Sequence, residues 1–516
     1  MDAPQTEYEL KFEVEPDQVT RLLRAAWLRA MLVGGPSKRH LRAVYYDTPD
    51  WDLRRRAASY RVRKSGRQYC QTLKTPPDQS HQQFARSELE TALADATPLP
   101  HDIPGDAWPL GEGQLTELAP VFETDIHRVV RTLAPSESAE IEMSVDKGTV
   151  RCEEQSESLC EIEFELKHGE PGALLDLGKE VIRTIPARLS AYYKADRGYE
   201  LASSDSAPWV KADVPSLQRD QTAEEAFAAL FSVCLRQVRL NEEHVLRTGH
   251  AEAVHQLRVG LRRLRSLFQL YKENLPRKHY DRFAKELKWI TTRSGAVRDW
   301  DVFVEQRLTP VQKAFPDVNA LNMLRDRAVE HLRHARSSLA RALRSARYAR
   351  FLLEAGDWVQ HRRWREQSVT EQSAALFSPV ADFAAVKLDD MDQKTRKKAK
   401  QLAALSPEQR HRARIAVKKT RYAADFFRSL FSGKDTKKYG KRLKTLQDCL
   451  GRMNDIANLA TMTETLFAAE GEETNTTEAA YASGIMVGWH AAELDRLTAE
   501  AQSEWKKLRK TAPFWR

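Results

Sequence analysis

The chain has 516 residues, of which 41% are hydrophobic and 30% charged, and its formal net charge is +9. This balance is typical of a globular protein with two to four domains. No apolar run reaches the roughly 20 residues of a membrane-spanning helix, and the opening MDAPQTEYEL lacks the pattern of a secretory signal. The five scattered cysteines form no CxxC pair, so they indicate neither a disulfide framework nor a zinc site. We therefore expect no membrane partner and a cytoplasmic location.

Charge is divided unevenly along the chain. Residues 1–210 hold 26 Lys and Arg against 35 Asp and Glu, whereas residues 211–516 hold 56 against 38. Such a contrast suggests two domains with different partners. The small, polar, proline-bearing stretch ASSDSAPWVKADVPS is the expected join. We predict a first domain at 1–202, a linker at 203–218 and a second domain at 219–516.

Charged and apolar residues alternate through much of the first domain. In the first such segment Glu7, Glu9 and Lys11 fall on one face of a strand, and aromatic and aliphatic side chains fall on the other. The pattern recurs in SYRVRKS, YCQTLKTP, FARSELET, AEIEMSVDKG and CEIEFELK. Helical patterns occur between strands, at 16–33 and 171–186. The sequence thus predicts an α+β domain built on an antiparallel sheet.

A strand with one charged face is ordinarily a strand with one face in water. Several such strands with charges of both signs have a second explanation, because a sheet closed into a barrel directs one residue set into its interior. Clustered carboxylates repel each other unless a cation lies between them, and Mg²⁺ is commonly shared between carboxylates and phosphates. Arginine and lysine in the same interior would bind the phosphates. The pattern therefore favours a site for a metal and a polyanion.

Short motifs in the first domain resemble the CYTH family, the triphosphate tunnel metalloenzymes that include class IV adenylyl cyclases and thiamine triphosphatases. In the order of the family, the matching segments are Glu7-x-Glu9-x-Lys11, YYDTPDWDL, Arg61-Val62-Arg63, TLK, FETDIHR, EIEFE and SAYYKADRGYEL. Tyr60 departs from the aliphatic residue usual at its position, but it falls on the apolar face. The resemblance covers roughly 5–202 and implies an eight-stranded antiparallel tunnel barrel that binds triphosphate with Mg²⁺ or Mn²⁺.

The resemblance also implies roles for individual residues. The expected catalytic residues are Glu7, Glu9 and Lys11, the last binding phosphate or positioning the attacking water. The expected metal-binding acids are Glu7, Glu9, Glu142, Glu161, Glu163 and Glu165; alternation leaves open which of the last three bind. The expected triphosphate-binding residues are Arg61, Arg63, Lys74, Arg86, Arg128 and Lys194. Further tunnel acids are Glu88, Glu90 and Asp146.

Metal-dependent hydrolysis of inorganic triphosphate is the activity that this resemblance favours. Neutralising the phosphate oxygens and aligning water with the leaving group are what the reaction requires, and no GxSxG nucleophile elbow is present. A class IV-type adenylyl cyclase is one alternative. A non-catalytic protein that binds polyphosphate or its granules is the other.

Helical periodicity dominates from residue 219 onward, and two blocks repeat at the same offset of 156 residues. HQLRVGLRRLRSLFQLY aligns with HRARIAVKKTRYAADFF, and LKWITTRSGAVRDWDVF aligns with LKTLQDCLGRMNDIANL. The shared offset predicts a duplicated helical bundle with pseudo-repeats at about 219–370 and 371–516. Gly295 and Gly451 are expected to form the turn after a helix.

One face of each repeated helix is basic, with little acid to neutralise it. Charged faces are ordinarily just solvated, but a run of like charges is unfavourable unless a polyanion joins it. Lysine and arginine without interleaved aromatics favour a phosphate chain over nucleic-acid bases, so nucleic acid is a disfavoured partner. The expected polyphosphate-binding residues are His255, Arg258, Arg262, Arg263, Arg265, His411, Arg414, Lys418, Lys419 and Arg421.

The second domain resembles the CHAD family, which often follows CYTH. The segments that carry the resemblance are HQLRVGLRRLR, RDWDV, HRARIAVKKTRY, LQDCLGRMND and the terminal APFW. It implies two pseudo-symmetric helical bundles that bind inorganic polyphosphate, and association with polyphosphate granules. In the second copy Asn454 and Ala457 replace Arg298 and Asp301, so the two RDWD-type segments are not expected to be equivalent.

Overall fold

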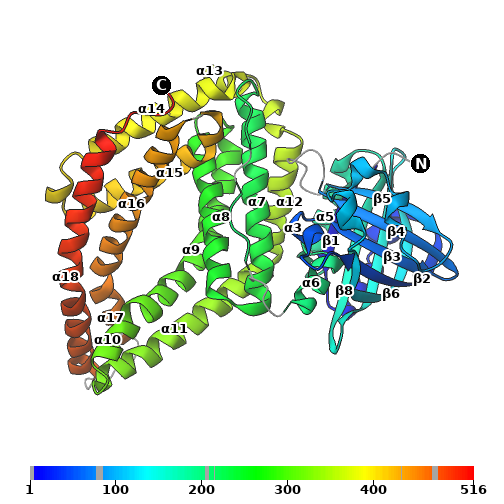
Figure 1. Cartoon of the computed structure of the whole chain (residues 1–516), viewed down its shortest axis with the longest axis horizontal. Helices are drawn as coiled ribbons and strands as arrows, with labels where there is room; N and C mark the ends of the chain where they lie inside the picture. Colours follow the sequence, from blue (N-terminus) through cyan, green and yellow to red (C-terminus); the bar gives the residue numbers. More distant parts are fainter. Residues whose placement is uncertain (1–4, 77–84, 204–208, 214–215, 432, 468–474) are drawn as a thin grey trace. The chain divides into compact units, whose positions relative to one another are not determined.

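The computed structural model describes residues 5–76, 85–203, 209–213, 216–431, 433–467 and 475–516. It divides into two compact units. A barrel unit comprises Met1–Val210, Arg239–Thr248 and Arg341–Arg363, and a helical unit comprises Lys211–Val238, Gly249–Ala340 and Trp364–Arg516. The named strands all belong to the N-terminal part of the chain, and the part that follows is helical (Figure 1). The predicted fold class, an antiparallel β domain followed by an all-α domain, is confirmed.

Nine antiparallel strands form the sheet of the barrel unit in the described part of the chain. They are β1 (Gln5–Glu13), β2 (Leu32–Asp47), β3 (Ser59–Ser65), β4 (Gln68–Thr75), β5 (Ala85–Leu93), β6 (Ala119–Ser136), β7 (Ala139–Cys152), β8 (Gln155–His168) and β9 (Arg188–Leu189). Their order is β5-β4-β3-β2-β6-β7-β8-β1-β9, and β5 also pairs with β1. This last pairing joins eight of the strands in a ring, and β9 is a two-residue addition.

The seam of the barrel lies along β1. Residues Gln5–Tyr8 pair with β5, whereas residues Glu9–Glu13 pair with β8. The first half of β1 thus pairs with β5 and the second half pairs with β8. The hydrogen-bonded ring is therefore incomplete along this strand. The nine-stranded antiparallel sheet is therefore barrel-like and not a fully closed eight-stranded barrel.

The apolar residues of β1 point away from the barrel interior and are covered by a helix. Leu10 and Phe12 are fully buried. A Cβ atom at Gly178 in α5 (Pro171–Thr184) would lie 2.8 Å from Leu10 Cδ1, so a glycine at this position allows the helix to approach closely. The alternating charged residues line the internal cavity instead. Packing the apolar residues of β1 outside, as expected from the sequence, leaves the interior beside this strand for charge.

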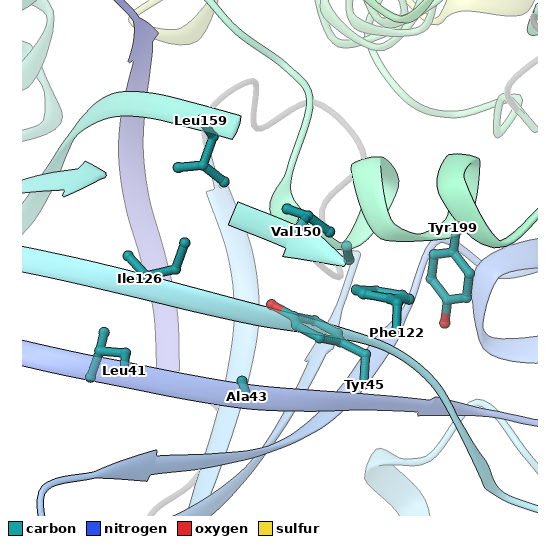
Figure 2. Close-up of a cluster of buried hydrophobic side chains, with 9 residues drawn as sticks. Leu41, Ala43, Tyr45, Phe122, Ile126, Val150, Leu159 and Tyr199 are labelled. Carbon is teal, nitrogen blue, oxygen red and sulfur yellow. The ribbon is translucent and has the colours of Figure 1, made fainter. Parts of the chain in front are cut away.

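One part of the barrel interior is apolar (Figure 2). A buried cluster contains Leu41, Ala43, Tyr45, Phe122, Ile126, Val150, Leu159, Ala195 and Tyr199. The rings of Tyr45 and Phe122 stack with centroids 4.5 Å apart. Gly198 in α6 (Lys194–Ala202) allows the helix to lie against Phe122, since a Cβ atom there would be 2.0 Å from the ring. This packing fixes α6, whose first residue lines the cavity.

Tyr60 lies in a second apolar cluster, which includes Trp108 and Leu73. Its hydroxyl donates a hydrogen bond to Gln71 Oε1 at 2.6 Å, and its ring meets that of Trp108 at a centroid distance of 5.2 Å. It does not line the internal cavity. The prediction that it belongs to the apolar face is confirmed.

Short helices accompany the sheet. Besides α5 and α6 they are α1 (Pro16–Leu23), α2 (Ala26–Met31), α3 (Asp52–Arg55) and α4 (Glu112–Leu115). The helical stretch expected at 16–33 is therefore two helices, α1 and α2, and its last residues open β2. The one expected at 171–186 corresponds to α5.

The remaining chain is helical. Its α-helices are α7 (Ala223–Thr248), α8 (Ala251–Leu270), α9 (Arg277–Val302), α10 (Thr309–Ala314), α11 (Asn319–Leu343), α12 (Ala346–Gln360), α13 (Glu371–Ala374), α14 (Val380–Lys398), α15 (Pro407–Phe427), α16 (Lys434–Ala457), α17 (Leu459–Phe467) and α18 (Asn475–Arg509). A π-helical turn, Phe303–Leu308, follows α9. Within the described residues, every helix is too short or too polar to span a membrane. The repeated blocks are the helix pairs α8–α9 and α15–α16.

Two expected turns are wrong. Gly295 lies inside α9 and Gly451 inside α16, and both helices continue beyond them. A glycine within a helix costs only about 1 kcal/mol relative to alanine, so the packing of a long helix can override it. At Gly295 the nearest atom to an ideal Cβ position is Arg258 Nη2 at 3.8 Å, an ordinary van der Waals distance, so the packing does not require glycine there. Nothing lies within 4 Å of that position at Gly451, so the structure explains neither glycine by packing.

Candidate functional site

The barrel contains an open cavity of about 430 Å³ whose walls are mostly polar. A volume of this size is typical of sites for small molecules. The lining residues are Glu7, Glu9, Lys11, Arg39, Tyr45, Ser59, Arg61, Arg63, Thr72, Lys74, Glu88, Leu89, Glu90, Arg128, Glu142, Glu163, Glu165, Lys167, Tyr193, Lys194 and Ala195. Carboxylates and cations from strands far apart in the sequence are thus brought around one space.

Three carboxylates form a row across adjacent strands of this wall. Glu165 on β8 is paired in register with Glu9 on β1 and with Glu142 on β7, and side chains in such positions lie about 5 Å apart at their Cβ atoms. Burial raises the pKa of Glu165, and the nearby charge of Glu142 adds to this effect. We call Glu9, Glu142 and Glu165 the carboxylate row.

The carboxylate row has few cations to neutralise it. Lys167 Nζ donates a hydrogen bond to Glu165 Oε1 at 2.5 Å, and Lys11 Nζ lies 4.0 Å from Glu9 Oε1. Glu142 accepts a hydrogen bond from Ser144 at 3.4 Å. Oxygen donors that repel each other in this way suit a hard divalent cation such as Mg²⁺. The residues present therefore fit the metal that the sequence motif implies.

A second group of charges lies deeper in the wall and is internally paired. Its acids and cations are Asp146, Glu161 and Glu163 with Lys11, Arg128 and Lys194. Arg128 Nη2 donates to Asp146 Oδ2 and to Glu163 Oε2, each at 2.6 Å. Lys194 Nζ lies 2.8 Å from both Asp146 Oδ2 and Glu163 Oε1 and also contacts Glu161. These pairs hold the cations in place at the edge of the cavity.

Burial separates the three predicted acids of β8. Glu161 is 1% exposed and does not line the cavity, whereas Glu163 and Glu165 do. Burial alone would raise the pKa of Glu163, but the ammonium of Lys194 and its other cationic neighbours hold it well below its usual range. Glu163 is thus an ionised partner of these cations, and the buried Glu161 contacts two of them, Lys11 and Lys194. Asp146, fully buried, has the same supporting position.

A third group of charges lies between β4, β5 and the start of β1. Lys74 Nζ lies 2.9 Å from Glu7 Oε2 and 2.6 Å from Glu88 Oε2. Arg61 is 3.9 Å from Glu88 and donates to the Tyr45 hydroxyl at 3.2 Å. Burial, with the adjacent Glu88, raises the pKa of Glu7 to about 8, while Lys74 helps to lower that of Glu88. A cation bound beside Glu7 would oppose this rise and favour its ionised form.

Of the remaining predicted residues of the barrel, two face each other at the cavity wall. Arg63 Nη2 donates to Glu90 Oε2 at 2.7 Å, and the Thr72 hydroxyl donates to the same oxygen at 3.3 Å. The backbone of Arg86 in β5 pairs with that of Glu7 in β1, but the side chain of Arg86 lies outside the described part of the chain.

Sequence reasoning missed several residues that line the cavity. They include Tyr193, whose ring centre lies 4.6 Å from Lys11 Nζ, and Tyr45, whose hydroxyl is hydrogen-bonded to Arg61. Lys167 continues the inward alternation of CEIEFELK, so the pattern itself could have assigned it. Arg39 belongs to no segment with that alternation, and no local signal could have found it.

The helical unit holds a separate cluster of cations on α8 and α15. We define this basic cluster as Arg258, Arg262, Arg265, Arg414 and Lys418. Burial and the neighbouring arginines, Arg262 first among them, lower the pKa of Lys418 to about 7. Burial and Arg258 lower the pKa of Arg262 to about 10. These shifts reflect burial together with like charges held close to one another, and Arg258 is partly neutralised by Asp299, whose Oδ1 lies 2.9 Å from its Nη1.

Other residues predicted to bind polyphosphate have different surroundings. Arg263 is 4% exposed and donates to Gln237 Oε1 at 3.0 Å and to the Asp213 carbonyl at 2.8 Å. Its guanidinium is engaged in these buried hydrogen bonds, so Arg263 is not part of the proposed binding site. Arg421 donates to Asp425 at 2.7 Å and is partly neutralised.

The two predicted histidines and Lys419 lie around the basic cluster. His411 Nδ1 lies 3.1 Å from Asn454 Oδ1. Burial and the charge of Arg298 lower the pKa of His255, which opposes protonation of this imidazole. Burial and Lys398 lower the pKa of Lys419, which extends the positive field beyond the cluster.

Comparison with known proteins assigns both parts of the chain. The CYTH domain model matches residues 5–199 and the CHAD domain model matches residues 229–464. An inorganic triphosphatase of Haemophilus influenzae is 26% identical over 286 residues, which are 54% of this chain and 76% of that protein.

Solved structures are similar to each part of the chain. The crystal structure of the CHAD domain from Ricinus communis is 28% identical, with a TM-score of 0.49, covering 58% of this chain and 98% of that one. A Hippeastrum protein described as having a dominant triphosphatase activity is 16% identical, with a TM-score of 0.29, covering 38% of this chain and 95% of that one. From the two family models, the chain contains a CYTH domain followed by a CHAD domain.

Proposed function

We propose that the barrel hydrolyses inorganic triphosphate with Mg²⁺ or Mn²⁺. The observation that carries the proposal is the carboxylate row, which shares one cavity with cations from other strands and from α6. The similarity to an inorganic triphosphatase supports the same substrate. We keep the sequence-based domain boundaries, 1–202 and 219–516 with a linker at 203–218, because the family models fall within them.

Glu9, Glu142 and Glu165 would hold the metal, with Glu7 beside them. When bound, the metal would neutralise phosphate oxygens and stabilise the charge that develops as the phosphoanhydride breaks. Arg61, the partner of Glu88 and Tyr45, is placed to bind the phosphate chain through its planar guanidinium.

Lys11 remains protonated in this site. Burial alone would lower its pKa, but the adjacent carboxylates Glu161 and Glu163 raise it above its usual value. A permanent ammonium cannot act as a general base. We therefore assign it to binding a terminal phosphate oxygen or orienting the attacking water, together with Arg128 and Lys194 on the same wall.

Phosphate release from inorganic triphosphate, ATP, thiamine triphosphate and long polyphosphate, each with Mg²⁺ and with Mn²⁺, tests the proposal. We expect triphosphate to be hydrolysed fastest, and the Glu7→Gln plus Glu9→Gln variant to lose that activity with either metal. Cyclic AMP as the main product from ATP would instead establish the cyclase alternative. If neither metal stimulates hydrolysis of any substrate, the remaining alternative is a non-catalytic protein that binds polyphosphate.

For the helical unit, we propose that the basic cluster binds inorganic polyphosphate. Burial and the neighbouring arginines lower the pKa of Lys418, and a phosphate chain would relieve the like-charge part of this effect. Binding there could supply the barrel with substrate and place the protein at polyphosphate granules. The five free cysteines are consistent with a reducing compartment, and we propose the cytoplasm.

Polyphosphate affinity is expected to fall as pH rises through about 7, because Lys418 has a pKa of about 7 before binding and must take up a proton to pair with phosphate. Arg262→Gln plus Lys418→Gln should lower the affinity about 10- to 100-fold and reduce the slope of log K against log[salt] by about 1.4 to 1.8. Isothermal titration with polyphosphate at several pH values and salt concentrations measures both.

The matched control is Lys437→Gln plus Lys441→Gln, which removes the same charge from exposed positions of α16. It should retain the pH dependence and most of the affinity. Hydrolysis of inorganic triphosphate should be unchanged in both double variants. Equal losses of affinity in the two variants would show that net charge, and not the basic cluster, governs binding.

A further inference from the structure

Two histidines and an aspartate lie together on the outer face of the barrel, away from the proposed triphosphate site. In the register of β2 with β6, His40 is opposite His127 and Arg42 is opposite Asp125. Arg39 and Arg128, one residue away from the histidines, line the internal cavity. Because successive side chains of a strand point to opposite faces, the histidines face outward.

The three side chains converge. The imidazole rings of His40 and His127 are stacked, with centroids 4.4 Å apart and planes at 10°. His40 Nε2 lies 2.6 Å from Asp125 Oδ1, and one potential ligand atom from each of the three residues lies within 4.8 Å of the others. A tetrahedral ion with bonds of about 2.0–2.2 Å requires ligand atoms about 3.3–3.6 Å apart, so the two imidazoles would turn out of their stacked arrangement to bind it.

We propose that His40, Asp125 and His127 form a binding site for a zinc-like transition-metal ion. Imidazole nitrogen with a carboxylate is a donor set that zinc accepts, and three protein ligands leave a fourth position for water. The side chains of His40 and Asp125 are 41% and 29% exposed, so an ion can reach them from solvent. This site is independent of the proposed hydrolysis.

Arg42 determines which carboxylate oxygen is available. Its Nε lies 3.2 Å from Asp125 Oδ2, on the oxygen that does not face His40. A hydrogen bond of this kind orients a ligating carboxylate and leaves the other oxygen for the metal. The positive charge of Arg42 opposes any divalent cation equally, and it is the two imidazoles that favour a transition metal over Mg²⁺.

The ion would join two long strands at a defined register. β2 and β6 also supply Arg39 and Arg128 to the cavity, at positions adjacent to His40 and His127. A metal bound across this pair would resist sliding or separation of the strands, as any ligand that binds only the folded state stabilises it. The site therefore belongs to the scaffold that presents these two arginines.

Zinc titration of the full-length, chelator-treated protein tests the proposal, with a chromophoric chelator as competitor. In a Glu9→Gln plus Glu142→Gln background, which weakens the barrel's carboxylate site, we expect one zinc equivalent to bind. His40→Gln and His127→Gln, added singly to that background, should each lower its affinity at least tenfold. His101→Gln, at an exposed histidine of the same unit, should leave it unchanged.

Two further readouts do not depend on any enzyme activity. Zinc should raise the melting temperature of the chain, and this shift should be lost with either histidine variant. Cobalt should give the visible absorption of nitrogen-ligated tetrahedral Co²⁺, again lost on substitution. Zinc binding that is absent from the parent background, or that is unaffected by both variants, would reduce the cluster to a hydrogen-bonded, stacked pair and overturn the proposal.

Discussion

Glutamine in place of Glu142 is expected to lower kcat/KM for inorganic triphosphate about 100- to 1,000-fold, a loss of roughly 3–4 kcal/mol of transition-state stabilisation. The substitution keeps the shape of the side chain but removes one of three charges from the carboxylate row. With one charge fewer, the row should bind Mg²⁺ more weakly. Steady-state phosphate release as a function of metal concentration measures both effects, and excess metal should restore part of the activity.

Glu140→Gln is the matched control for this substitution. Glu140 lies on the same strand two residues earlier, is exposed, and does not line the cavity. Its loss should change the activity less than twofold, because it makes no contact with the proposed metal or substrate. Comparable losses in the two variants would mean that the general acidity of β7, and not the carboxylate row, supports catalysis.

Alanine in place of Asp146 is expected to destabilise the barrel by about 3–5 kcal/mol, the usual cost of removing one partner of a buried ion pair. The Asp146 carboxylate is fully buried and accepts two hydrogen bonds from Arg128, at 2.6 and 2.7 Å, beside Lys194 at 2.8 Å. Its removal would leave Arg128 and Lys194 with Glu163 and Glu161 alone. Urea unfolding followed by circular dichroism and by tryptophan fluorescence measures the change.

The exposed pair of Asp176 with Lys179 provides the comparison. Asp176 is 77% exposed, so Asp176→Ala should cost at most about 1 kcal/mol. The pKa of Asp146 is lowered in the folded state, where Lys194 and Arg128 outweigh burial. Its contribution is therefore present above its ordinary pKa and lost as pH falls below it. A destabilisation under 1 kcal/mol for Asp146→Ala at neutral pH would contradict the supporting role given to this residue.

Local patterns were sufficient for the strands and for the direction of their side chains. Alternation is a property of a strand by itself, so YELKFE already separates the outward Leu10 and Phe12 from the inward Glu9 and Lys11. The basic faces of α8 and α15 followed from helical periodicity in the same way. The CYTH and CHAD motifs, as ordered sets of such segments, made both families recognisable.

How deeply each side chain of a strand or helix is buried could not be predicted from the sequence pattern of that element. Glu161, Glu163 and Glu165 share one face of β8, yet only the last two reach the cavity, because Lys194 from α6 and Lys11 from β1 cover the first. Similarly, adjacent arginines of α8 differ in role because Gln237 in α7 meets Arg263 and not Arg262. These distinctions depend on neighbours that are remote in sequence.

The sequence by itself thus determined the two families, the strand and helix periods, and which side of each element carries charge, since these depend on residues a few positions apart. Only the tertiary structure decided the carboxylate row, the internally paired acids and the meeting of His40 with His127. Each of these requires the register between strands, which is set by long-range packing and hydrogen bonding and has no local signal.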